Sequence, residues 1–256
     1  EVAGAEHDGY YYPSFAGVGR SLNYYPINDE MPEDGVAEIA VGLGKYIVDG
    51  GLALRFSPRH PDKVLQTSTL DLALRDTQTQ LYALDLKDVE GGFKVDDGFN
   101  IKKIRVQDAA KNGSLRYMVS TFDPYDQVIR DSEYGNGRRV VTFANVLQHK
   151  AFPLAEIVDF MLSEGEKEMR RPVEIEFAGC IDKHGETKGN VYWLQIRPIV
   201  DRKEMLDEKI MHTSDSQLIM KTSSALGHGM MDGVTDVVYV KTQNFSSFNT
   251  PSVARE

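Results

Sequence analysis

Four polar residues in the second half of the chain have the types and spacing to bind a phosphorylated ligand. Glu174 and Glu176 stand two residues apart, and Gln195 and Arg197 repeat that spacing a short distance downstream. Mg²⁺ prefers hard oxygen ligands and takes one or two carboxylates together with phosphate oxygens. A guanidinium group donates a fork of hydrogen bonds to phosphate. The four residues therefore indicate a platform for a magnesium–triphosphate complex.

The segments around these residues have the alternation of β-strands, in which successive side chains point to opposite faces. A polar turn at 182–190 separates the segments, so we expect an antiparallel hairpin with Glu176, Gln195 and Arg197 on one face. Same-face neighbours lie about 7 Å apart along a strand, close enough to meet on one ligand. The opposite face is predicted to be apolar and to carry Val173, Ile175, Phe177, Tyr192, Leu194 and Ile196.

The same pattern has a second interpretation, in which the hairpin is a half-exposed surface element without a ligand. Alternating polar and apolar residues occur in any such hairpin, and glutamate opposite arginine is a common cross-strand pair. The alternation alone does not separate the two interpretations.

The elements that position the hairpin are a helix before it and several strands far upstream. Apolar residues at helical spacing predict a helix over 153–168, which must end by Pro172 because proline cannot continue it. Residues 5–35 predict short strands and turns, and 36–42 predict a buried strand. Residues 87–115 are predicted to be rich in loops, with one alternating segment at 101–106. The mixed spacing of 70–86 favours a helix, intact or broken.

Composition limits the classes of protein to which the chain can belong. The 256 residues carry a net charge of −10, and no clustered basic face is visible, so we expect no nucleic-acid partner. No apolar run approaches the length of a membrane span, so we expect no membrane partner. The single cysteine, Cys180, excludes an internal disulfide framework and favours the cytoplasm.

The motifs resemble the close of the ATP-grasp nucleotide-binding domain in the phosphoenolpyruvate synthase and pyruvate phosphate dikinase family. The runs 171–177 (RPVEIEF) and 194–198 (LQIRP) are similar to the family's two closing strands, which carry Asp-Ile-Glu-Phe and Gln-x-Arg-Pro. The run 42–50 (GLGKYIVDG) is similar to its glycine turn, and 222–240 resembles the start of its swivelling phosphohistidine domain. Residues 55–150 match no part of it.

The resemblance implies roles for the four polar residues. Glu176 and Gln195 would hold the metal and the triphosphate of ATP, and Arg197 would contact phosphate. Glu174 stands where the family has aspartate, and both the ribose and the metal are left open as its contact. Lys45 replaces a glutamate of the family, so no function is carried onto it.

The resemblance also implies an α+β fold and an internal fragment of a longer enzyme. We expect the larger lobe of an ATP-grasp domain over 1–200, a linker over 201–216, and the truncated start of a swivelling domain over 217–256. The remaining basic residues of the clamp would lie upstream, and the pyruvate-binding barrel downstream. The fragment is therefore expected to be inactive by itself.

The phosphate-carrying histidine of the family is expected beyond residue 256, so the chain itself is predicted to hold no catalytic residue. None of its histidines has the family's Thr-Cys-His setting, and His228 is interpreted as part of a glycine-rich turn; the others are His7, His60, His149, His184 and His212.

The parent reaction implied is phosphorylation of pyruvate to phosphoenolpyruvate by ATP and Mg²⁺. Two rival functions stay open: another phosphotransferase acting on a glucan or an antibiotic, and a non-enzymatic binding module that stacks ligands on Tyr10–Tyr12 and Tyr24–Tyr25. A glycosidase using Glu174 and Glu176 is a poor third, because its carboxylates normally flank the substrate from separate elements. The assembly state, including a homo-oligomer, is left open.

Overall fold

The computed structural model describes residues 3–86, 98, 100–132, 135, 137–182, 189–199, 214–219 and 233–237. The fold is α+β, and every strand pair of the described residues is antiparallel. The chain forms two compact units, residues 1–200 and residues 201–256. In the second unit the described residues include one short 3₁₀ helix, Asp215–Gln217. The predicted strands of a swivelling domain lie largely outside the described residues.

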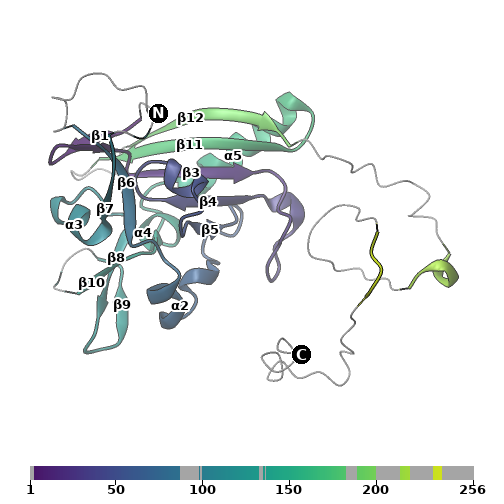
Figure 1. Ribbon diagram of the computed structural model, residues 1–256, viewed down its shortest axis with the longest axis horizontal. Helices are drawn as coiled ribbons and strands as arrows, with labels where there is room; N and C mark the ends of the chain where they lie inside the picture. Colours follow the sequence, from purple (N-terminus) through teal and green to yellow (C-terminus); the bar gives the residue numbers. More distant parts are fainter. Residues whose placement is uncertain are drawn as a thin grey trace. The chain divides into compact units, whose positions relative to one another are not determined.

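A five-stranded sheet forms the body of the first unit, in the order β12-β11-β3-β4-β5. Figure 1 shows the long strands β11 (Val173–Ile181) and β12 (Gly189–Pro198) beside β3 (Phe15–Arg20), with β12 at the outer edge. The strands β4 (Val36–Ala40) and β5 (Leu54–Phe56) complete the sheet. Strands from both ends of this unit therefore meet in one sheet, with β11 at the contact between them.

Two smaller sheets lie beside the first one. The first has the order β1-β2-β6-β7 and is formed by Ala5–His7, Tyr10–Tyr12, Gln80–Asp85 and Ile101–Arg105. The second has the order β10-β8-β9 and is formed by Arg138–Val141, Val119–Asp123 and Val128–Arg130. The broken helix expected over 70–86 is therefore wrong in its second half, because Gln80–Asp85 pairs with strands on both sides.

Among the helices of the described residues, α5 (Leu154–Met169) is the longest and packs on the five-stranded sheet. It follows Pro153 and ends where Arg170 adopts a left-handed conformation with φ 55°, just before Pro172. This confirms the helix predicted over 153–168. The other α-helices of the described residues are α1 (Lys45–Val48), α2 (Leu70–Arg75), α3 (Val106–Ala109) and α4 (Ala144–Leu147). In the part of the chain that the structure describes, no helix could cross a membrane, because none combines the length and the apolar character that a span needs.

Part of the hydrophobic core lies between the sheet and α5, and it determines which face of β11 is apolar. Val173, Ile175 and Phe177 are buried on that face. The Phe177 ring lies over Gly17 of β3, where a Cβ atom would stand 2.3 Å from the ring Cζ and 2.9 Å from the Glu38 carbonyl oxygen. Only glycine fits under the ring, so the aromatic side chain and the bare backbone position specify each other.

This contact predicts the cost of adding a single methyl group. Gly17→Ala should lower the free energy of unfolding by about 1–3 kcal/mol, because the buried Phe177 ring has to move. Urea denaturation followed by fluorescence measures the loss. In a Phe177→Leu background the same substitution should cost less, because the shorter side chain vacates the space. If the losses of stability from Gly17→Ala and Phe177→Leu are additive in the double variant, the contact between Phe177 and Gly17 does not determine the packing here.

Candidate functional site

The strands β11 and β12 form the predicted antiparallel hairpin. Glu174 pairs with Arg197 and Glu176 pairs with Gln195 across the two strands. Direct cross-strand partners lie on the same face of a sheet. The prediction that Glu176, Gln195 and Arg197 share one face is therefore confirmed, and Glu174 shares it with them.

A β-bulge changes the rest of the predicted pattern. The register shifts between Glu176 and Phe177, so that Phe177 pairs with Trp193 and Leu194 is the extra residue. Trp193 thus approaches α5 at Gly165, where a Cβ atom would lie 3.5 Å from the indole ring. The prediction that Leu194 shares the apolar face with Ile196 is wrong, because the bulge turns Leu194 towards the pocket that Glu176 and Gln195 line. Tyr192, which pairs with Ala178, likewise leaves the predicted apolar face.

A pocket of about 330 Å³ opens on the polar face of the sheet. The strands β11 and β12 contribute Glu176 and Gln195, the glycine turn contributes Gly44, and the first residue of α1 contributes Lys45. The remaining lining residues are Gly17, Val18, Val48, Phe177 and Leu194. The pocket thus brings together two segments more than 100 residues apart in the sequence, the turn at 42–44 and the β11–β12 hairpin.

Glu176 and Gln195 line this pocket, and their side chains have no protein partner in the part of the chain that the structure describes. Among the residues that the structure describes, no hydrogen bond or ion pair engages the carboxylate of Glu176 or the side-chain amide of Gln195. The described residues also contain no group of three or more histidine, cysteine, aspartate or glutamate side chains placed to hold a metal ion. The donor set of one carboxylate and one amide oxygen fits Mg²⁺ that obtains its other ligands from phosphate and water.

Glu174 is engaged by two arginines. Arg20 Nε donates to Glu174 Oε2 at 2.7 Å, and Arg197 donates to Oε1 through Nε at 2.8 Å and also through Nη2. Only 8% of Glu174 is exposed. Burial by itself would raise the pKa of Glu174, but the hydrogen bonds and charges of the two arginines outweigh it and hold the pKa below its ordinary value.

Lys45 lines the same pocket as Glu176 and Gln195, although the resemblance to the dikinase family assigns no role to it. Its Nζ donates to Asp49 Oδ1 at 3.0 Å, one turn along α1. This hydrogen bond holds the pKa of Lys45 above its ordinary value, so the side chain is a cation at neutral pH. The sequence could have indicated Lys45 as a residue of this site, because it directly follows Gly42-Leu43-Gly44, a turn that resembles the glycine turn of the dikinase family.

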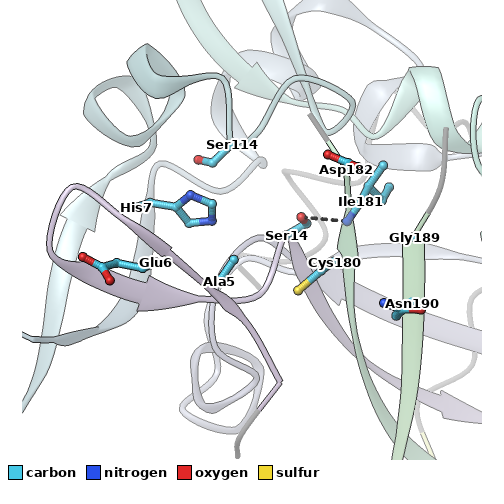
Figure 2. A pocket seen from close by; sticks show the side chains of 10 residues that line it. All are labelled: Ala5, Glu6, His7, Ser14, Ser114, Cys180, Ile181, Asp182, Gly189 and Asn190. Carbon is cyan, nitrogen blue, oxygen red and sulfur yellow. Dashed lines mark hydrogen bonds between the residues drawn. The ribbon is translucent and has the colours of Figure 1, made fainter. Parts of the chain in front are cut away.

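A larger cavity, of about 400 Å³, lies at the other end of β11 and β12 (Figure 2). Burial raises the pKa of the Cys180 thiol there, and Ser14 accepts a hydrogen bond from the Ile181 backbone at 3.1 Å. Its charged residues are the carboxylates of Glu6 and Asp182, and the described residues that line it include no lysine or arginine. This lining would repel a polyphosphate, whereas the pocket beside Glu176 and Gln195 contains the cation of Lys45.

The tyrosines proposed as a stacking surface are not all accessible. Tyr12 is buried and its hydroxyl lies 2.9 Å from that of Ser114, whereas 59% of Tyr25 is exposed. A stacking surface that includes Tyr12 is therefore excluded by packing. Of the histidines, His184, His212 and His228 lie outside the described residues.

Searches against known proteins found no matching family model and no matching curated protein.

The two arginines predict how stability depends on pH. Because folding lowers the pKa of Glu174, the ionised carboxylate stabilises the fold above the ordinary glutamate pKa of about 4.3. Glu174→Gln should therefore reduce the free energy of unfolding by about 1–3 kcal/mol at pH 7, and the difference should shrink as the pH falls below about 4. Urea denaturation between about pH 3 and pH 7 measures it. A difference independent of pH would show that the charge of Glu174 is not what stabilises the fold.

Proposed function

We propose that this chain is the larger lobe of an ATP-grasp domain and binds Mg-ATP on the polar face of the β11–β12 hairpin. The observation that carries the proposal is the pair Glu176 and Gln195, which stand opposite each other and line a pocket without protein partners among the described residues. A carboxylate and an amide that face a pocket without a protein partner keep their oxygens available to accept hydrogen bonds or bind a metal. The resemblance of the closing strands to the dikinase family supports the same assignment.

Glu176 and Gln195 would supply oxygen ligands to Mg²⁺, and Mg²⁺ bound there would neutralise charge on the phosphates. Phosphoryl transfer needs mainly positioning and charge neutralisation, so a metal held by the sheet meets part of that need. Lys45, which lines the same pocket, adds a positive charge on the side of the glycine turn. Arg197, two residues along β12 from Gln195, would donate to phosphate oxygens.

The reaction proposed for the full-length protein is ATP-dependent formation of phosphoenolpyruvate from pyruvate through a phosphohistidine. The carrier histidine and the pyruvate site are assigned to segments beyond this chain, so the chain by itself should not catalyse the transfer. A phosphotransferase with another acceptor, a glucan or an antibiotic, would use the same nucleotide lobe. The acceptor domain of the full-length protein separates these two.

The metal-binding role predicts the effect of removing one carboxylate. In the full-length protein, Glu176→Ala should abolish transfer of labelled phosphate from ATP, because the metal loses its charged ligand. Transfer to the protein and then to pyruvate is followed with radiolabelled ATP. The matched control is Glu166→Ala, which removes an exposed glutamate of α5. Transfer by the Glu176 variant at the rate of the unmodified protein would leave the hairpin as a surface element.

The assignment of the phosphocarrier gives a second test in the same assay. Arg197→Ala should reduce labelling severely, because the phosphates lose a guanidinium cation that Glu174 holds beside them. His228→Ala should leave labelling of the protein intact, because the carrier histidine is expected elsewhere. Loss of label in the His228 variant would place the carrier within this chain.

A further inference from the structure

Arg20, Glu174 and Arg197 form one row across three neighbouring strands. Glu174 of β11 pairs with Arg20 of β3 on one side and with Arg197 of β12 on the other. The three side chains therefore lie on one face of the sheet, the face of Glu176 and Gln195. The sequence motif marks Glu174 and Arg197 but gives no sign of Arg20.

The row carries a net positive charge. A single carboxylate is shared by two guanidinium groups, and the carboxylate is nearly buried while the arginine side chains are 44% and 60% exposed. Glu174 is thus in a poor position to bind a further cation, because both of its oxygens already accept hydrogen bonds from arginine. Its effect on a ligand would be exerted through the arginines that it holds.

Arg20 uses only part of its guanidinium group on Glu174. The ion pair is made by Nε, and among the described residues no partner engages its two terminal nitrogens. These two nitrogens form the planar edge that binds phosphate oxygens in a bidentate manner. Because the ion pair already restrains the side chain, Arg20 would lose less conformational freedom on binding than an unrestrained surface arginine.

The distance from this row to the pocket suits a polyphosphate. The neighbouring row on the same strands is Val18, Glu176 and Gln195, two residues away, which is about 7 Å along a strand. The same face also carries the exposed carboxylate of Glu38, opposite Val18. A phosphate chain bound beside these carboxylates needs cations next to it, and the arginine row supplies them.

We propose that Arg20 is a second phosphate-binding arginine of the site, and that Glu174 is a positioning residue that holds Arg20 and Arg197 beside the pocket. The ligand class is a polyphosphate in its magnesium complex, recognised by its phosphates rather than by its base. The inference rests on the proposed function for the identity of the nucleotide, but the recognition of a polyphosphate is a property of the row itself.

The test compares ligands that differ in their phosphates. Binding of Mg-ATP, of magnesium tripolyphosphate and of AMP is measured by calorimetry on the full-length protein and its variants. Arg20→Gln should weaken the binding of Mg-ATP and of magnesium tripolyphosphate about tenfold or more and leave the binding of AMP unchanged. The matched control is Arg105→Gln, because Arg105 of β7 makes the same kind of Nε ion pair, 2.7 Å from Asp108, on another sheet. This control should bind all three ligands as the unmodified protein does.

The positioning role of Glu174 is tested by combining variants. Glu174→Gln should weaken the binding of the two polyphosphates but not that of AMP. Its effect on polyphosphate binding should be smaller in the Arg20→Gln background, because both changes act through Arg20. If Arg20→Gln causes misfolding, Arg20→Met, which keeps most of the aliphatic stem, replaces it. Weaker binding of AMP by these variants would indicate a structural defect and would contradict the proposal.

The outcomes separate this inference from the proposed function. Binding of Mg-ATP that depends on Glu176 but not on Arg20 would overturn the inference and leave the function standing. Binding of magnesium tripolyphosphate that depends on Arg20, without any binding of Mg-ATP, would support the inference and overturn the function. Failure to bind either polyphosphate would overturn both.

Discussion

The register of β11 between β3 and β12 is the constraint on which the rest of the site depends. A slip by one residue would turn Glu174 and Glu176 towards α5 and their apolar neighbours towards solvent. Packing on the opposite face prevents such a slip, because Phe177 lies over Gly17 and Ile175 lies over Gly19, where any side chain would crowd them. The hydrophobic face of the sheet therefore determines the chemistry of the polar face.

Within that register, two neighbouring carboxylates meet different environments. Glu174 is nearly buried and is neutralised by arginines from the strands on both sides. Glu176, two residues along the same strand, is half-buried and lines the pocket with Gln195 and Lys45. One carboxylate is thus neutralised within the protein, and the other has no partner among the described residues. Under the proposed function, the same face would offer both an anchored pair of cations and a position for Mg²⁺, which a triphosphate in its magnesium complex needs.

The sequence was sufficient for elements whose signal is local. The hairpin, the helix before it and the strand at 36–42 follow from alternation, helical spacing and proline. The bulge at Leu194 was missed because nothing in the two strands marks a change of register. Arg20 was missed because its role depends on β3 lying beside β11, a pairing across more than 150 residues that no local pattern reveals. Burial of Tyr12 was missed for the same reason, since its partner Ser114 is distant in the sequence.

A crystal structure of the protein with Mn²⁺ and a non-hydrolysable ATP analogue tests the central claim most directly. We predict an anomalous Mn²⁺ peak within coordination distance of Glu176 and Gln195, with the phosphates extending along the hairpin towards Arg197. A nucleotide bound instead in the cavity beside Cys180, or a metal with no contact to Glu176, would contradict it.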